Sequence, residues 1–138
     1  MGSLASINIW AVLAAAVASF LFGGAYYGVL SKPWMNAVGK TPEQIRSTGM
    51  AVPLLVTMIA LVVMAIILSG IIHHVAPGAG KTRGGLLSGF LCWIGFVATT
   101  LATNHAYQGQ KSRLTIIDGG YWLGVLLIQG AILGTMGV

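Results

Sequence analysis

Three histidines and one cysteine are the side chains of this 138-residue chain best suited to metal binding or nucleophilic chemistry. His73 and His74 are adjacent, so on a helix they point about 100° apart. His105 ends the next apolar segment, which runs the opposite way, so most of a membrane thickness separates it from that pair. Zinc needs all its ligands about 2 Å away, so no shared metal site is predicted. Cys92 lies alone in an apolar stretch and is expected to be a small core residue.

The segment from Pro77 to Thr82 resembles the end of a phosphate-binding loop. That motif requires a glycine five residues before its last glycine, where this chain has Val75, and it follows a β-strand. The glycines are therefore expected to form a tight turn, and Lys81 to be a charge at a membrane boundary. With no catalytic constellation in the sequence, neither a cofactor nor an enzymatic activity is predicted.

Polar side chains within the apolar segments could line a path for a small solute. Counted along each helix at about 1.5 Å per residue, they fall near one level in the cytoplasmic half, with Asn104 and His105 closer to the surface. An amide facing lipid leaves its donors and acceptor unpaired, so we expect Gln129 to face the interior and to bond a neighbouring helix. The candidate polar layer comprises Ser19, Thr57, Thr99, Thr103, Asn104, His105 and Gln129.

Small residues recur at every fourth position, a spacing that lets membrane helices approach closely. One such stripe begins at Ala11, and a second consists of Gly95, Thr99 and Thr103. Glycine pairs with the same spacing include Gly85 with Gly89. The predicted packing residues, within one subunit or between subunits, are Ala11, Ala15, Ser19, Gly23, Gly95, Gly120, Gly124, Gly130 and Gly134.

Four apolar segments are long enough to carry these residues across a membrane, which requires about 20 residues each. The chain is 57% hydrophobic and 7% charged, whereas about a quarter of the residues of a soluble domain are charged. The segments contain no Asp, Glu, Lys or Arg, and they do not alternate as barrel strands do. The sequence predicts an all-α integral membrane protein, with one domain over residues 1–138 whose four transmembrane helices form one bundle, at about 7–27, 50–72, 84–106 and 119–138.

The connections carry signals for helix boundaries. Thr41 is placed to cap a helix that has Pro42 at its first position and Gln44 reaching back to the cap. This helix either lies along the membrane surface or runs straight into the second span. The third connection is polar from Gln108 onward, and Asp118 is placed to cap the last span.

The basic residues predict the orientation of the chain. The first and third connections share one side of the membrane and carry Lys32, Lys40, Arg46, Lys111 and Arg113. The second connection carries Lys81 and Arg83. Because cytoplasmic loops are enriched in Lys and Arg, the first and third connections are expected in the cytoplasm and both termini outside it. The net charge of +5 is scattered rather than gathered into a patch, so nucleic-acid binding is not predicted.

The chain resembles a bacterial family of small four-helix membrane proteins catalogued as domain of unknown function 1761. The resemblance covers nearly the whole chain and rests on Asn8, Trp10-Ala11-Val12, the stretch 23–27, Trp34 and Gly39 before Glu43, and Gly119-Gly120-Tyr121. It implies a four-helix protein of the bacterial inner membrane and supplies no activity, cofactor or catalytic residue.

Functions of different classes remain open. The favoured one is a non-catalytic membrane protein, in contact with lipid, that packs as an accessory subunit of a homo-oligomer or of a larger membrane complex. The alternative is a channel or uncoupled transporter for a small solute, using the polar layer. Charge-coupled transport is disfavoured because the predicted spans contain no ionisable group suited to carry a proton. An intramembrane enzyme would have to use His105 or Cys92, neither of which has an evident partner.

Overall fold

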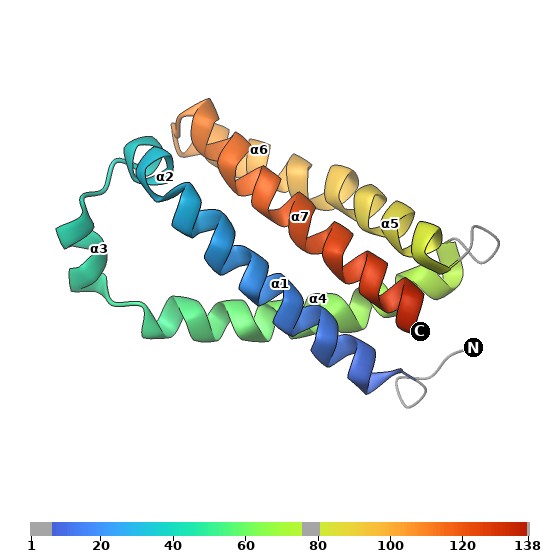
Figure 1. Cartoon of the computed structure of the whole chain (residues 1–138). Coiled ribbons are helices and arrows are strands. Elements are labelled where there is room, and N and C mark those ends of the chain that lie inside the picture. Colours follow the sequence, from blue (N-terminus) through green and yellow to red (C-terminus); the bar gives the residue numbers. More distant parts are fainter. Residues whose placement is uncertain (1–6, 76–80, 138) are drawn as a thin grey trace.

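The computed structural model describes residues 7–75 and 81–137, and this part of the chain is helical without strands. Four helices are long and apolar enough to cross a membrane: α1 (Ile9–Val29), α4 (Ala51–Val75), the compound helix Lys81–Tyr107 and α7 (Ser112–Met136). They pack into one bundle (Figure 1). The predicted all-α membrane bundle with four spans is therefore confirmed, whereas the turn predicted at 76–80 lies outside the described residues.

A short helix that the sequence did not predict, α2 (Ser31–Val38), follows α1 after a single residue. It ends at Gly39, whose φ of 76° is left-handed and therefore favours glycine. Ala37 is buried in a small cluster with Leu114 and Ile117 of α7. This contact places α2 over the first turns of α7.

The next helix, α3 (Pro42–Thr48), begins with the predicted cap. The Gln44 N–H donates to Thr41 Oγ1 at 3.2 Å, and the Thr41 N–H donates to Gln44 Oε1 at 2.9 Å. No residue of α3 is buried, and Gly49 with a φ of 82° separates it from α4. Of the two predicted alternatives, the structure therefore shows a separate helix rather than an extension of the second span.

A π-helical turn, Trp93–Val97, interrupts the third span between α5 (Lys81–Cys92) and α6 (Ala98–Tyr107). Such a turn holds one extra residue and changes which side chains face a neighbouring helix. Here it follows the part of the span that packs most closely on α7. The Trp93 indole N–H crosses to α7 and donates to the Gly119 carbonyl at 2.9 Å.

The backbones of α5 and α7 touch through glycines. A Cβ atom built on Gly85 would collide with the Gly130 carbonyl, and one built on Gly130 would collide with the Gly85 carbonyl. A Cβ on Gly134 would collide with the Lys81 carbonyl. Only glycine permits this separation, so the predicted role of Gly130 and Gly134 is explained by direct backbone contact.

Gly120 and Gly124 of α7 and the small residues of α1 lie where α1 and α7 face each other. Ala11, Ala15 and Ser19 have no exposed surface, which places this stripe inside the subunit. A Cβ added at the remaining positions would meet an aromatic side chain: Gly23 faces Tyr121, Gly120 faces Tyr26 and Gly124 faces Phe22.

Gly95 differs from the other predicted packing positions in having no neighbouring helix within the described chain. A Cβ at this position would meet nothing within 4 Å. Thr99 and Thr103, which continue its stripe, are exposed on the outside of α6. Of the two predicted alternatives for this stripe, contact within the subunit is absent among the described residues, and contact between subunits stays a prediction.

The last span begins at Ser112, earlier than the predicted start near residue 119. Lys111 occupies the N-cap position without a side-chain hydrogen bond, so Asp118 is not the helix cap and lies in the second turn of α7. The helix extends this far because Leu114 and Ile117 are buried under α2. The polar sequence of Gln108 to Arg113 suggested a longer connection than the tight turn that forms.

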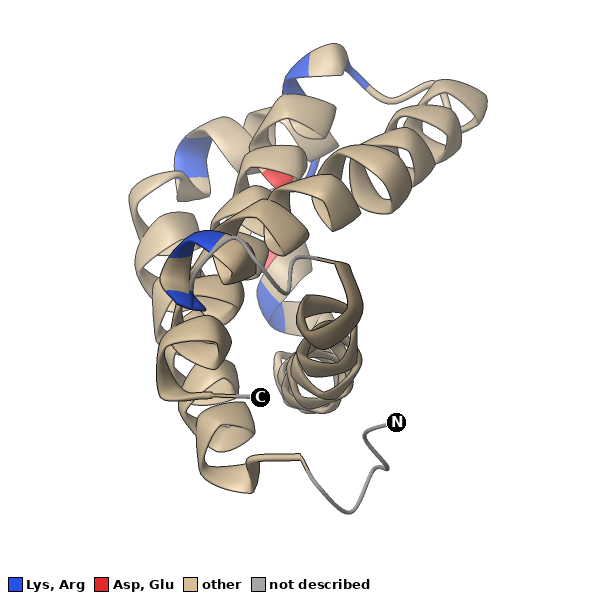
Figure 2. Ribbon diagram, turned by 90° about the vertical axis from the view of Figure 1, so that its right-hand side faces the viewer, with Lys and Arg blue, Asp and Glu red and all other residues tan. Residues whose placement is uncertain are grey.

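The two ends of the bundle are defined by contacts between distant residues. At one end Asn8 Nδ2 donates to the Met136 carbonyl at 3.3 Å, and the hydroxyl groups of Thr82 and Thr135 are 2.6 Å apart. At the other end, Lys111 Nζ donates to the Asn36 carbonyl at 3.3 Å, which joins the α6–α7 turn to α2 (Figure 1). The Lys and Arg residues are distributed over the molecule and form no single patch (Figure 2).

Candidate functional site

Four polar side chains from three helices meet at the α2 end of the bundle. The Tyr27 hydroxyl of α1 donates to Asp118 Oδ1 of α7 at 2.7 Å. The other carboxylate oxygen, Oδ2, lies 4.0 Å from His105 Nε2 of α6. His105 Nδ1 lies 2.9 Å from the Thr115 hydroxyl. We call Tyr27, His105, Thr115 and Asp118 the Asp118 cluster.

Aromatic rings surround the Tyr27 side of this cluster. The Tyr27 ring lies 5.0 Å from Tyr121 and 6.2 Å from Trp34, measured between ring centroids. Tyr26 adds a second anchor, because its hydroxyl donates to the Ile117 carbonyl at 2.7 Å. The rings hold the Tyr27 hydroxyl against the carboxylate and restrict the access of water to it. Side chains of Asp118 and His105 are correspondingly only 20% and 12% exposed.

Asp118 lies within α7 rather than before it. At about 1.5 Å per residue, Asp118 lies about 9 Å along α7 from Ser112. It is an ionisable group in the second turn of the helix, close to side chains of two other helices. Ionisable residues within spans are costly and are usually paired, as Asp118 is with Tyr27 and His105. Chemically, the cluster can hold a negative charge, and it can hold a proton on His105.

The sequence contained a signal that would have placed Asp118 inside the helix. Leu114 and Ile117 are three residues apart, as expected for one buried face of a helix that begins before Asp118. The pairing with Tyr27 could not be read from the sequence, because the two residues are 91 positions apart and meet only in the folded bundle. Of the predicted polar layer, His105 is the member that joins this cluster.

Gln129 and Ser19 form a second polar contact, in the centre of the bundle. Both have no exposed surface. Gln129 Nε2 donates to the Ser19 hydroxyl of α1 at 3.1 Å and to the Leu61 carbonyl of α4 at 3.0 Å. Ser19 in turn donates to the Ala15 carbonyl at 2.7 Å. The amide of α7 thus connects three spans, although its Oε1 atom and the Ser88 hydroxyl have no partner among the described residues.

The remaining members of the predicted polar layer do not reach this centre. Thr99 and Thr103 are exposed and Thr57 is half-buried, and each donates to the carbonyl four residues earlier in its own helix. Asn104 is also exposed. A continuous polar layer across all four spans therefore does not form. The hydroxyl groups satisfy themselves locally, which residue depth alone could not reveal.

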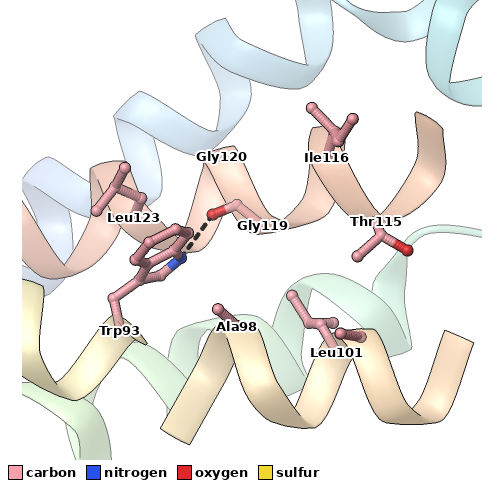
Figure 3. Close-up of a pocket in the computed structure, with 9 residues that line it drawn as sticks. Trp93, Ala98, Leu101, Thr115, Ile116, Gly119, Gly120 and Leu123 are labelled. Carbon is pink, nitrogen blue, oxygen red and sulfur yellow. Dashed lines mark hydrogen bonds between the residues drawn. The ribbon is translucent and has the colours of Figure 1, made fainter. Parts of the chain in front are cut away.

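Two neighbouring hollows lie between α6 and α7. The larger, of about 450 Å³, is lined by Trp93, Ala98, Leu101, Ala102, Thr115, Ile116, Gly119, Gly120 and Leu123 (Figure 3). The smaller, of about 290 Å³, is lined by Ala102, His105, Ala106, Gln110, Ser112, Thr115 and Ile116. They share the lining residues Ala102, Thr115 and Ile116 and so lie next to each other, and we call the pair of hollows the α6–α7 groove.

The other residues considered for chemistry are separated from the cluster. His73 and His74 lie in the last turn of α4, with their ring centroids 5.2 Å apart. Cys92 is partly buried and packs against the main hydrophobic core. Among the described residues, no group of three His, Cys, Asp or Glu side chains could hold a metal ion.

The sequence of the chain matches one known protein family. Residues 10–134 match a family described as "Protein of unknown function (DUF1761)". The chain belongs to this family. The match spans the four membrane helices, including Tyr27, His105 and Asp118. No curated protein and no solved structure matches, so for this DUF1761 protein the functional argument depends on the geometry of the chain itself.

We predict that Tyr27→Phe destabilises the protein by about 1.5–3 kcal/mol, the usual contribution of a hydrogen bond to a charged group. The substitution removes the donor to Asp118 and leaves a partly buried carboxylate with one partner fewer. The free energy of unfolding, measured by denaturant titration in detergent, tests this expectation. Tyr107→Phe is the matched control, because the Tyr107 side chain is 91% exposed. Equal stability of the two variants would show that the Tyr27–Asp118 bond contributes nothing.

Proposed function

We propose that this DUF1761 protein is a non-catalytic packing subunit of a bacterial inner-membrane assembly, either a homo-oligomer or a larger complex. The proposal depends on the outward stripe of Gly95, Thr99 and Thr103. Stripes of small residues promote close contact between membrane helices. The other predicted packing positions of the chain contact a neighbouring helix, whereas this stripe has none within the described chain. We therefore infer that this stripe packs against a helix of another molecule.

The first half of α4 provides further support. Residues 50–56 are all exposed, and the six of them that belong to α4 make more than one full turn, so they cover every face of the helix. The buried residues of α4 begin only at Leu61. In Figure 1 this half of the helix diverges from α1. A stretch of helix that is exposed on every face within the described part of the chain is suited to contact a partner.

A small-solute channel is less well supported by the same geometry. Gln129, the deepest amide, is bonded to Ser19 and to the Leu61 carbonyl, and neither hollow of the α6–α7 groove is lined by it. Three members of the predicted polar layer, Thr99, Thr103 and Asn104, are exposed. The buried amide is better explained as a link between helices, a role in which such bonds contribute about 0.6 kcal/mol on average.

Photo-crosslinking in native membranes tests the proposed interface. We expect a photoreactive phenylalanine at Thr99 to give a discrete product, at twice the mass of the chain for a homo-oligomer or at a higher mass for another partner. The same group at Leu21, which is 66% exposed on α1, should give little product. Adding Gly95→Leu should abolish the product at Thr99, because the bulky side chain would fill the stripe. No product at Thr99, or equal products at both positions, would contradict the proposal.

We further propose that both termini lie outside the cytoplasm. The end of the bundle formed by α2, α3 and the α6–α7 turn carries five basic residues, and the end where α5 begins carries two. Reporter fusions after Val138 and at Gln110 should give periplasmic and cytoplasmic signals respectively. The reverse pattern would overturn this orientation, and equal signals would indicate that the chain inserts both ways.

A further inference from the structure

The α6–α7 groove changes character along its length. Its larger hollow is lined mainly by apolar and small residues between Trp93 and Ile116. Its smaller hollow reaches the α6–α7 turn and adds three polar residues, His105, Gln110 and Ser112. The combined groove is therefore apolar within the span and polar at the membrane boundary. A phospholipid beside the helix presents the same sequence of chemistry, with acyl chains below and a polar head group above.

The groove also has the size and position needed for a bound molecule. The larger hollow, at about 450 Å³, lies within the roughly 300–1,000 Å³ typical of small-molecule sites. It is formed where α6 faces Gly119 and Gly120 of α7, and a Cβ added at Gly119 would meet nothing within 4 Å. The Trp93 indole closes its inner part by bonding to the Gly119 carbonyl (Figure 3). This leaves a slot open along the outside of the helix pair.

The charges around the boundary end favour an anionic head group. Arg113 is exposed and lies one helical position from Ser112 and one turn from Ile116, both of which line the groove. Lys111 is adjacent in sequence, although its Nζ donates to the Asn36 carbonyl. The nearest acidic residue in the chain, Asp118, has its oxygens directed to Tyr27 and His105. His105 Nδ1 is hydrogen-bonded to the Thr115 hydroxyl, and its Nε2 lies 4.0 Å from Asp118 Oδ2.

We propose that the α6–α7 groove binds one molecule of an anionic phospholipid. One acyl chain occupies the apolar hollow beside Trp93, and the phosphate head group lies at Gln110 and Ser112, within reach of Arg113. Anionic lipids are attracted by basic residues at the membrane surface, which explains the preference for charge. The apolar slot supplies affinity for the chain, and Arg113 supplies selectivity for the head group.

Native mass spectrometry of the purified full chain in mild detergent tests the proposal. The protein is equilibrated with equal amounts of phosphatidylglycerol and phosphatidylcholine that carry the same acyl chains but differ in isotope label. We expect one phosphatidylglycerol to be retained preferentially. Arg113→Gln should reduce this preference about fivefold, the effect of one surface charge, and Arg83→Gln at the opposite end should leave it unchanged.

A second variant separates the acyl site from the head-group site. Ala102→Leu places a large side chain in the stretch shared by both hollows, on an exposed position where folding tolerates it. It should abolish retention of either lipid, with circular dichroism and elution volume unchanged. Lipid retention unaffected by Ala102→Leu would overturn the site. Equal retention of both lipids would overturn the anionic preference. A second copy of the chain displaced by Ala102→Leu would assign the groove to a protein partner instead.

Discussion

The direct backbone contact between α5 and α7 is the constraint on which the rest of the bundle depends. Gly85 and Gly130 lie so close that neither position accommodates a Cβ atom. In a bilayer the lipid is as apolar as the side chains, so helices associate through close packing rather than through expulsion of water. Glycines allow the largest number of such contacts. Here these contacts tie the position of α7 to one helix, α5.

The position of α7 explains how the other helices are arranged. It is the most buried of the four spans. In its apolar 18-residue stretch 44% of the residues are buried, against 28% or less in the corresponding stretches of the other three. It contacts α5 through glycine, α1 and α4 through the Gln129 amide, and α1 and α6 through Asp118. Hydrogen bonds and close polar contacts of Gln129 and Asp118 therefore hold α1, α4 and α6 against α7, whereas glycine contact holds α5. The outer stripe of α6 and the first half of α4 remain for other molecules.

The sequence was sufficient to predict the fold class and the approximate spans, because four long uncharged apolar segments permit few other structures in a membrane. It also indicated Gln129 and Gly130 as interior positions. It failed where tertiary contacts override local composition. The first turns of α7 look like a polar loop until α2 covers Leu114 and Ile117. Depth along a helix placed Thr99 beside Gln129, but depth does not specify the direction in which a side chain points. The Asp118 cluster depends on residues distant in sequence.

The free energy of unfolding of Gly130→Ala, compared with that of Gly70→Ala, tests the central claim most directly. Both substitutions add one methyl group to a glycine within a spanning helix. At Gly70 the added Cβ meets nothing within 4 Å, whereas at Gly130 it collides with the carbonyl of Gly85. We predict that denaturant titration in detergent shows a loss of about 1–3 kcal/mol for Gly130→Ala. Gly70→Ala should be neutral or gain up to about 1 kcal/mol from helix propensity. Equal effects of the two substitutions would contradict a bundle organised by glycine contact.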